Sequence, residues 1–318
     1  MWHREAMSVV KVHGLTKQYG ELNAVAGVDL NIEQGEIFSL LGPNGAGKTT
    51  TVEILEGFRP RSSGSVSVLG VDPNNGDSAW RNRLGIVHQN SQDAGDLSVA
   101  ETVHHFAKYY QNSRDADEVI SAVGLDEKRG SLIRNLSGGQ RRRLDVALGI
   151  IGNPELLFLD EPTTGLDPRG RQDMWGVIDE LVKGGVTLLL TTQYLEEADH
   201  LADEIAVIDS GKVIARGTSD VLKKQVGGER LEVVVEIQHL PKTQEIVAAI
   251  SGFKPTIDEG IRQISAPVST GAKALFDVLK ALEEAGIHAL DVGLKRPSLD
   301  DVFLSLTGHS AENLEEKK

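Results

Sequence analysis

The stretch that decides the fold runs from residue 42 to residue 50 and reads Gly42-Pro43-Asn44-Gly45-Ala46-Gly47-Lys48-Thr49-Thr50. It follows an apolar run, Glu36-Ile37-Phe38-Ser39-Leu40-Leu41, that predicts a buried strand, and it precedes Thr51-Val52-Glu53-Ile54-Leu55, which continues as a helix. The pattern G-x-x-x-x-G-K-T between a strand and a helix is typical of a loop that binds phosphate. The alternative is a glycine-rich turn that only joins strand to helix, and the complete pattern in its context disfavours it.

The residue types of this loop suit phosphate binding for direct physical reasons. Glycines at positions 42, 45 and 47 allow the backbone to turn its N–H groups inward, and the following helix directs the positive end of its dipole at the same point. Lys48 can reach the β- and γ-phosphates of a nucleotide, and the Thr49 hydroxyl can bind Mg²⁺. The loop therefore predicts a nucleotide site that also uses Mg²⁺.

Length and composition set the broad class of the protein. The chain has 318 residues, which suggests two domains, and its 40% hydrophobic and 25% charged residues are typical of globular proteins. No apolar run approaches the length that spans a bilayer, so we do not expect a channel or carrier. The start lacks the apolar core of a secretory signal, and either Met1 or Met7 could be the first residue. With no cysteine, disulfide and thiolate chemistry are excluded, and a cytoplasmic location is expected.

Net charge narrows the choice of partners. The formal net charge of −14 argues against binding to nucleic acid or to an anionic membrane surface, because like charges repel. It permits docking to a basic patch on a partner protein. The histidines are scattered along the chain without the spacing of metal ligands. Because the net charge is negative, no nucleic-acid partner is expected.

The order of periodic segments predicts an α/β fold with a second, smaller domain. Strand periodicity near the amino terminus gives way to a helical insertion at about 98–151, after which nearly continuous apolar strands alternate with helices. This predicts a mostly parallel sheet covered on both faces, plus amino-terminal antiparallel strands. After a linker at Gly227-Gly228, the order strand-helix-strand-strand-helix-strand predicts a ferredoxin-like α+β domain. We predict domains at 1–226 and 229–308 and a flexible tail at 309–318.

Two acids end one of the apolar strands. Asp160 closes the run Leu156-Leu157-Phe158-Leu159, where an open α/β sheet places its ligand crevice. A carboxylate there can hold Mg²⁺ through water while Thr49 holds it directly. Glu161 follows and can orient a water for attack on the γ-phosphate, as a general base. A solvated strand end is the alternative.

A second glycine pair marks another helix start, in Leu136-Ser137-Gly138-Gly139-Gln140. Ser137 and Gln140 form the S-x-x-Q pattern of a capping box. Glycines in a first helical turn are costly, so the pair indicates close approach of another group, and a phosphate is the natural candidate. A merely well-capped helix is the alternative. The neighbouring Arg141-Arg142-Arg143 is interpreted as part of a solvated helix face, and docking to a partner as the weaker interpretation.

These motifs together resemble those of the ATP-binding-cassette (ABC) ATPases, over about residues 8–226. The phosphate loop, LSGGQ and Leu-Leu-Phe-Leu-Asp160-Glu161-Pro162 stand in the order of that family. The resemblance implies ATP and Mg²⁺ as cofactors and implies three further roles. Tyr19 would stack on adenine, Gln89 would touch Mg²⁺ or the attacking water, and Asp167 would couple two sites across a dimer. Tyr19 as a turn aromatic and Asp167 as the N-cap before Pro168 remain alternatives.

One position departs from the family pattern. After the strand 187–192 the family usually has a histidine that contacts the γ-phosphate, and this chain has Gln193. An amide can donate a hydrogen bond but cannot carry charge or transfer a proton, so catalysis would depend on Glu161. The runs 193–199 and 296–304 narrow the resemblance to the daunorubicin/doxorubicin-resistance ATP-binding proteins, in which glutamine is common at this position.

The resemblance implies the cytoplasmic ATPase subunit of a bacterial ABC exporter. Two copies would close over ATP and drive a separate membrane permease, with the ATPase held peripherally at the inner face of the membrane. Export of a drug or other amphiphile is inherited from the resemblance. A soluble ABC ATPase acting on ribosomes or DNA is one alternative. An adaptor whose segment 229–308 binds a regulatory small molecule is another.

Overall fold

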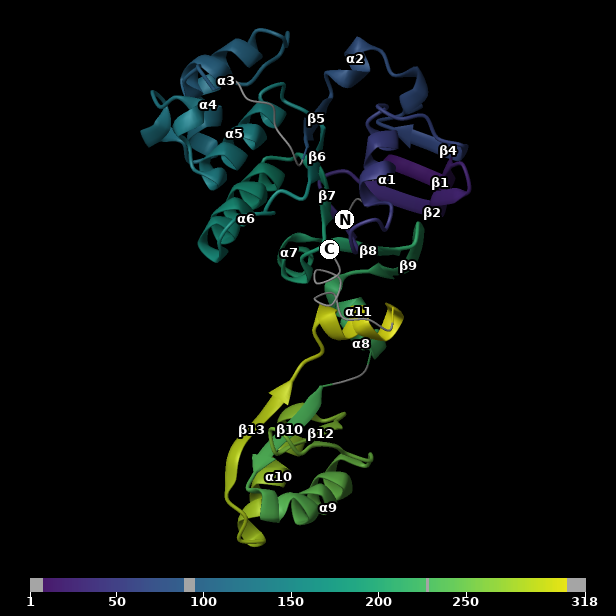
Figure 1. The fold of residues 1–318 in the computed structure, drawn as a ribbon, viewed down its shortest axis with the longest axis vertical. Helices are drawn as coiled ribbons and strands as arrows, with labels where there is room; N and C mark the ends of the chain where they lie inside the picture. The colour runs from purple at the N-terminus through teal and green to yellow at the C-terminus, as the bar shows by residue number, and fades with distance from the viewer. Residues whose placement is uncertain (1–7, 89–94, 227–228, 308–318) are drawn as a thin grey trace, which may run out of the picture. The chain divides into compact units, whose positions relative to one another are not determined.

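The computed structural model describes residues 8–88, 95–226 and 229–307, and these form two compact units (Figure 1). The first unit ends at Ser219 and the second begins at Asp220. Helix α8 (Ser219–Val226) crosses this division and leads to the predicted linker at Gly227-Gly228, which lies outside the described residues. The domain boundary placed after residue 226 therefore stays a prediction, as does the tail at 309–318.

The first unit alternates strands and helices along most of its length. Its elements are β1 (Ser8–Tyr19), β2 (Leu22–Glu33), β3 (Ile37–Leu41), α1 (Lys48–Leu55), β4 (Ser63–Val68), η1 (Pro73–Asn75), α2 (Ser78–Arg81), β5 (Leu84–Val87), α3 (Val99–Ala107), α4 (Ala116–Ala122), η2 (Asp126–Lys128), η3 (Ile133–Asn135), α5 (Gly138–Ile150), β6 (Leu156–Asp160), α6 (Pro168–Lys183), β7 (Thr187–Thr192), α7 (Leu195–Leu201), β8 (Glu204–Asp209) and β9 (Lys212–Gly217).

Two sheets organise this unit. The larger sheet has the order β5-β6-β7-β3-β8-β9, in which all neighbours are parallel except β8 and β9. A separate antiparallel sheet has the order β2-β1-β4. The predicted fold class, a mostly parallel sheet with amino-terminal antiparallel strands and a helical insertion, is confirmed.

The larger sheet separates two hydrophobic cores, because its strands alternate their side chains between two covered faces. Leu157 and Leu159 of β6 enter the core formed with α3, α4, α5 and α6. Phe158 of the same strand enters the core formed with α1 and the antiparallel sheet. Figure 1 shows α3 to α6 gathered on one side of β5, β6 and β7, and α1 with β1, β2 and β4 on the other. Both faces of the larger sheet are covered, so a ligand would bind at the ends of its strands.

The second unit contains an antiparallel sheet of order β11-β12-β10-β13. Its α9 and α10 share one core with the strands, which include Leu231, Val233 and Ile264. This order of strands matches the predicted ferredoxin-like arrangement. The elements are α8, β10 (Arg230–Val235), η4 (Ile237–His239), α9 (Leu240–Ser251), β11 (Thr256–Asp258), β12 (Gln263–Pro267), α10 (Gly271–Glu284), β13 (Ala289–Lys295) and α11 (Leu299–Thr307).

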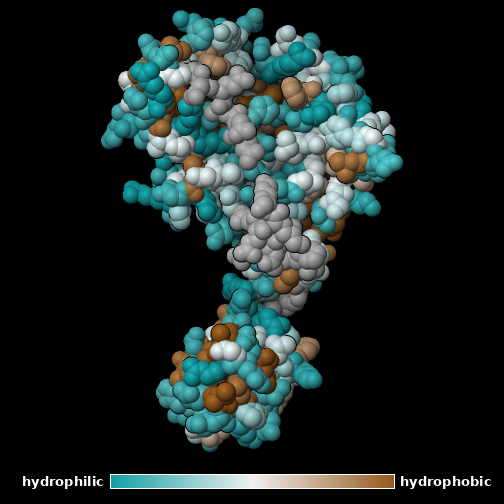
Figure 2. Space-filling view, viewed as in Figure 1, coloured by the Kyte–Doolittle hydropathy of each residue, from teal (hydrophilic) through white to brown (hydrophobic). Residues whose placement is uncertain are grey.

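The second unit exposes several large apolar side chains. Figure 2 shows hydrophobic side chains gathered on the visible face of this unit. Its large exposed apolar residues include Phe276, Leu279 and Leu290. Scattered single apolar residues are normal on protein surfaces. No helix among the described residues combines the length and apolar character needed to cross a bilayer.

Candidate active site

Three neighbouring parallel strands end at the same edge of the larger sheet and bring the predicted site residues together. The last residue of β3, Leu41, pairs with Thr192 at the end of β7, and Asp160 at the end of β6 pairs with Thr191. The phosphate loop follows β3, the two predicted acids lie at the end of β6, and Gln193 follows β7. The carboxyl edge is where open α/β sheets bind ligands.

The phosphate loop, residues 42–50, is enclosed by the backbone of its own chain. A Cβ atom on Gly42 would lie 2.2 Å from the carbonyl oxygen of Ile208, and one on Gly47 would lie 2.3 Å from that of Ala24. Gly47 also has φ of 101°, in the left-handed region, and forms the N-cap of α1 without a side-chain capping bond. Glycine is therefore required here by local geometry. The first amides of α1 have no side-chain cap to compete with a phosphate.

The side chain of Lys48 points back to the first residues of this loop. Its Nζ donates hydrogen bonds to the carbonyl oxygens of Gly42 at 2.7 Å and Pro43 at 3.1 Å, and lies 3.7 Å from Oε1 of Glu161. Burial lowers the pKa of Lys48, while the charges of Glu161 and Asp160 oppose that shift. Phosphate oxygens would be better acceptors for this ammonium than neutral carbonyls, because charge-assisted hydrogen bonds are stronger.

Asp160 and Glu161 are both buried and share a network with Thr191. The Thr191 hydroxyl donates to Oδ1 of Asp160 and accepts from the backbone N–H of Glu161 at 3.1 Å. Oε2 of Glu161 accepts a hydrogen bond from Thr164 at 3.1 Å. Glu161 has φ of 47°, a left-handed conformation that costs free energy in a residue other than glycine. The strand end therefore holds a residue with a strained backbone, whose carboxylate lies beside Lys48.

The donors near the loop fit Mg²⁺ as a metal shared with phosphate. Thr49 lies exposed in the first turn of α1, and Asp160 offers a carboxylate at the adjacent strand end. Hydroxyl and carboxylate oxygens are the hard ligands that Mg²⁺ prefers, usually with substrate phosphates and water completing the shell. Among the described residues no cluster of three or more histidine or acidic side chains could hold a metal alone. These residues suit a metal that arrives with the nucleotide.

The two predicted glutamines differ in what the structure says of them. Gln193 directly follows β7 and is half-buried at the carboxyl edge, in a turn where the N–H of Tyr194 donates to the Thr192 hydroxyl at 2.9 Å. It is therefore on the same edge as the phosphate loop. Gln89 lies outside the described residues, which stop at His88 after β5. Its predicted contact with Mg²⁺ or water stays a prediction.

Tyr19 ends β1 and is linked to the helix that the phosphate loop begins. The residue is 39% exposed, and its ring centroid lies 5.1 Å from Nζ of Lys17 and 5.5 Å from the guanidinium carbon of Arg59. Arg59 in turn forms a 2.5 Å ion pair with Glu53 of α1. Both the stacking role and the turn role remain compatible with this position.

The glycine pair of the LSGGQ motif, residues 136–140, begins α5 and faces open space. The predicted capping box is confirmed: the Ser137 N–H donates to Oε1 of Gln140 at 3.0 Å, and the Gln140 N–H donates to Oγ of Ser137 at 3.3 Å. A Cβ atom on Gly138 would have no neighbour within 4 Å, and one on Gly139 would meet only a Leu166 methyl group at 3.7 Å. Nothing described in this chain requires glycine here.

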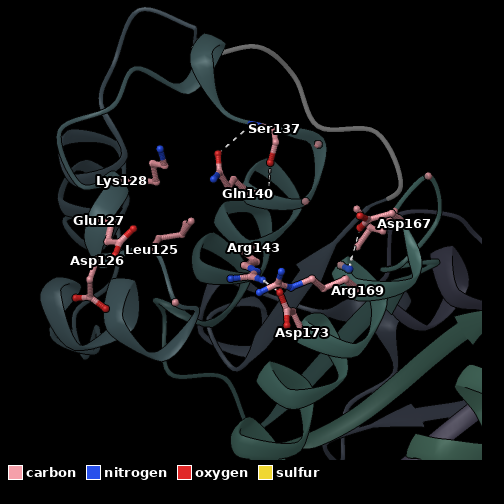
Figure 3. A pocket seen from close by; sticks show the side chains of 16 residues that line it. Leu125, Asp126, Glu127, Lys128, Ser137, Gln140, Arg143, Asp167, Arg169 and Asp173 are labelled. Atoms are coloured by element: carbon pink, nitrogen blue, oxygen red, sulfur yellow. Dashed lines mark hydrogen bonds and ion pairs between the residues drawn. The ribbon is translucent and has the colours of Figure 1, made fainter.

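The LSGGQ motif and Asp167 share an open hollow of about 810 Å³ (Figure 3). Oδ1 of Asp167 accepts from the N–H of Gly170 at 2.9 Å, so the predicted alternative role as N-cap of α6 is present. Figure 3 shows Ser137 and Gln140 on one side of the hollow and Asp167 and Arg169 on the other. Residues of the phosphate loop are absent from its described lining. The described lining of this hollow therefore contains the LSGGQ motif without the phosphate loop.

Arg142 corrects the interpretation of Arg141-Arg142-Arg143 as part of a solvated face. Its side chain is 7% exposed and donates to the carbonyl oxygens of Asp160 at 2.6 Å, Pro162 at 3.0 Å and His88 at 2.6 Å. The sequence held a signal for this, because Arg142 lies four and eight residues before the buried Val146 and Ile150 of α5. Because arginine is charged, the helical spacing of Arg142 with these buried residues was not interpreted as a sign of burial.

Two buried glutamates were also missed by sequence reasoning. Glu56 follows the last turn of α1, and burial together with Asp160 and Glu53 raises its pKa to about 8. Glu197 in α7 is fully buried, burial raises its pKa, and its Oε1 accepts from Nε1 of Trp175 at 3.4 Å. Glutamates at helix surfaces are usually solvated, so the residue type gave no signal.

Comparison with known proteins gives the family. The family model described as ABC transporter matches residues 25–164. The daunorubicin resistance ATP-binding protein DrrA3 of Streptomyces coeruleorubidus is 45% identical over 309 residues, which cover 95% of this chain and 97% of that protein. This chain belongs to the ABC transporter family. The daunorubicin/doxorubicin resistance ATP-binding protein DrrA of Streptomyces peucetius is 38% identical, covering 96% of this chain and 94% of that protein.

A solved ABC structure agrees with the fold. The dimeric structure of a post-hydrolysis ATP-binding cassette bound to ADP and Pi is similar with a TM-score of 0.59 and 25% identity, covering 66% of this chain and 98% of that one. The predicted activity is thereby confirmed: this ABC protein binds ATP and hydrolyses it. The resemblance to the DrrA proteins is confirmed as well.

Proposed function

We propose that this ABC ATPase works as a pair of identical subunits that close over two ATP molecules and drive a separate membrane permease that exports an amphiphilic drug. One observation carries the pairing. The phosphate loop is enclosed by its own chain, whereas Gly138 and Gly139 open the first turn of α5 toward space. Glycine in a helix costs stability, and no neighbouring atom of the described chain excludes a larger side chain at these two positions. The glycine pair therefore indicates that a group from outside the chain approaches closely.

That group is inferred to be the nucleotide on a second subunit. The first turn of α5 presents backbone amides and a positive dipole end, which favour an anion such as a γ-phosphate. The capping box keeps the turn folded before the ligand arrives. Asp167, across the hollow, is proposed to couple the two sites at the interface. The related cassette, a dimer bound to ADP and Pi, supports this arrangement.

Within each site we assign the hydrolytic roles as follows. Glu161 acts as general base on the attacking water, a role that its position 3.7 Å from Nζ of Lys48 supports. Lys48 binds the β- and γ-phosphates, and the amides of residues 42–50 surround them. Thr49 and Asp160 would hold Mg²⁺, which neutralises phosphate charge when bound. Gln193 donates an amide hydrogen bond to the γ-phosphate, and its neutral side chain takes no part in proton transfer.

Substrate and location are proposed from the relatives. The proteins at 45% and 38% identity are named for resistance to daunorubicin and doxorubicin, so a planar, amphiphilic drug is the first cargo to test. The permease would hold the subunit at the cytoplasmic face of the membrane. Co-purification of the tagged chain with a multispanning membrane protein is expected. Co-sedimentation with ribosomes or DNA instead would support the soluble alternative, which the net charge of −14 disfavours.

Mixing two inactive variants tests the composite site directly. Lys48→Ala disables the phosphate loop and keeps the LSGGQ motif, whereas Gly139→Trp blocks the LSGGQ motif and keeps the loop. Each variant alone should lack ATPase activity, and a mixture should regain it, because a mixed dimer contains one intact composite site. Gly139→Trp should still bind ATP. A mixture as inactive as its components, with both variants folded, would contradict the pairing.

A further inference from the structure

The buried Arg142 joins three backbone segments at the catalytic edge. Its guanidinium nitrogens reach the carbonyl oxygens of His88 after β5, Asp160 at the end of β6, and Pro162 beyond it, at 2.6, 2.6 and 3.0 Å. The side chain comes from α5, four residues after its first residue, Gly138. One side chain therefore connects the helix of the LSGGQ motif to the ends of two adjacent strands of the central sheet.

Two of these carbonyls flank Glu161 in the chain. Glu161 has φ of 47°, and a residue held in the left-handed region costs about 1–3 kcal/mol unless its surroundings enforce it. The Thr191 hydroxyl accepts from the Glu161 N–H, and Arg142 binds the carbonyl oxygens of the residues on either side of Glu161 in the chain. Arg142 thus acts on the backbone that carries the Glu161 carboxylate.

We propose that Arg142 is a positioning residue for ATP hydrolysis, holding the strained backbone of Glu161 in register with the LSGGQ helix. The proposal rests on the role assigned to Glu161 as general base. When the LSGGQ motif of α5 engages a nucleotide, the same helix carries the side chain that fixes Glu161 of its own subunit. Binding of the LSGGQ motif to the partner's nucleotide and alignment of Glu161 in its own site then depend on the same helix, α5.

The guanidinium contributes both charge and shape, and these can be separated. Burial lowers the pKa of Arg142, and the negative charges of Asp145, Asp160, Glu197 and Glu161 oppose that shift. Oδ2 of Asp145 lies 4.0 Å from Nη1 of Arg142. A lysine keeps this positive charge. It lacks the planar fork that directs several N–H groups at fixed angles, so one ammonium cannot hold three carbonyls in the same geometry. Arg142→Lys therefore tests the positioning role with the charge of the site preserved.

Arg83 provides a matched control at the opposite ends of the same strands. It precedes β5, and it binds Glu155, which precedes β6, at 2.5 and 2.9 Å, and the carbonyl oxygen of Leu69 at 3.2 Å. Arg83 thus ties the amino ends of β5 and β6 much as Arg142 ties their carboxyl ends. Arg83→Lys loses a comparable fork without touching the catalytic edge.

The experiment measures kcat, the ATP dissociation constant and the melting temperature of the full-length Arg142→Lys and Arg83→Lys proteins. We expect Arg142→Lys to lower kcat by about 10- to 100-fold, because small misplacements of a reacting group have effects of that order. Its ATP dissociation constant should stay within about threefold, the pattern of an interaction that matters only in the transition state. Arg83→Lys should leave both constants unchanged within the same margin.

Other outcomes overturn the proposal. An Arg142→Lys protein with normal kcat would remove the positioning role. A parallel loss of kcat, ATP affinity and melting temperature in both lysine variants would make Arg142 a structural residue only. Arg142→Gln, which keeps a short amide donor, replaces Arg142→Lys if the latter fails to fold; failure of both to fold would equally assign Arg142 to stability.

A parallel measurement separates this proposal from the assignment of Glu161. Glu161→Gln should bind ATP with little hydrolysis. If Glu161→Gln hydrolyses ATP normally, the base is wrongly assigned whatever Arg142→Lys does. If Glu161→Gln is inactive while Arg142→Lys is fully active, only the role of Arg142 fails.

Discussion

The two glycine-rich helix starts of this protein look alike in sequence and differ in surroundings. The start of α1 is closed in by its own chain, with the carbonyls of Ala24 and Ile208 lying where a Cβ atom of Gly47 or Gly42 would be. The start of α5 opens onto a hollow and tolerates a Cβ atom at Gly138 without any neighbour. The first glycines serve the fold of one chain, and we infer that the second pair serves contact with another.

Capping separates the two starts as well. Gly47 gives α1 no side-chain cap, whereas α5 begins with a capping box in which the side chains of Ser137 and Gln140 each accept the other residue's backbone N–H. The amides of α1 are thus left for a ligand, and bound ATP should stabilise this part of the fold by mass action. The α5 turn is complete without a ligand. Substitutions at the two starts should therefore separate folding from function.

The largest effect is expected for Gly47→Ala. A methyl group there would lie 2.3 Å from the Ala24 carbonyl oxygen and would hold alanine at φ of 101°. We expect the free energy of unfolding to fall by about 3 kcal/mol or more, with loss of ATP binding. Chemical denaturation and calorimetric titration with ATP measure both. Gly45→Ala is the control, because φ of 80° strains it without any clash, and it should lose about 1 kcal/mol. Equal losses would contradict the enclosure of α1.

Gly139→Ala should show the opposite pattern. The added methyl group meets only Leu166 at 3.7 Å, so the free energy of unfolding should stay within about 0.5 kcal/mol or rise. ATPase activity should fall by about 10²-fold, because the methyl group would stand between α5 and the partner's nucleotide. Gly176→Ala within α6, which also meets nothing within 4 Å, should stabilise by about 0.5–1 kcal/mol and keep full activity. Full activity in Gly139→Ala would remove the argument for pairing.

Much of this contrast could be predicted from the sequence, since short motifs with fixed spacing determine local chemistry. The phosphate loop, the capping box of Ser137 and the two acids at the end of β6 lie where the sequence predicts them. A mostly parallel sheet covered on both faces followed from apolar runs alternating with helices, whereas the order of its strands was not predicted.

The rest depends on contacts between distant segments, which one sequence does not reveal. The clash partners of Gly42 and Gly47 come from β8 and β2. The burial of Arg142 depends on carbonyls that follow β5 and β6, and the left-handed φ of Glu161 depends on the same neighbours. Sequence periodicity could have placed Arg142 on the buried face, but no local pattern indicates that backbone carbonyls would satisfy it.

Glu56 gives a pH test at the far end of α1. It holds its proton up to about pH 8 in the folded protein, against a reference pKa of 4.5. The folded state therefore binds more protons than the unfolded state between these values, and the free energy of unfolding should fall as pH rises across that window. Glu56→Gln should remove a slope of up to about 1.4 kcal/mol per pH unit. Denaturation of the nucleotide-free proteins from pH 5 to pH 8 measures it; parallel profiles would contradict the burial of this carboxyl group.

The smallest effect is expected for Ser137→Ala, and it decides whether the capping residue of α5 serves only its own helix. Loss of an N-cap hydroxyl should lower the free energy of unfolding by about 1 kcal/mol. Ser98, which caps α3 with Glu101 in a second capping box, is the matched control, and Ser98→Ala should have a similar cost. If the Ser137 hydroxyl also meets a phosphate across the dimer, Ser137→Ala should lose about tenfold in ATPase activity that Ser98→Ala keeps, the size of one charge-assisted hydrogen bond. Equal activities in the two variants would limit Ser137 to capping and leave the glycine pair alone facing the second subunit.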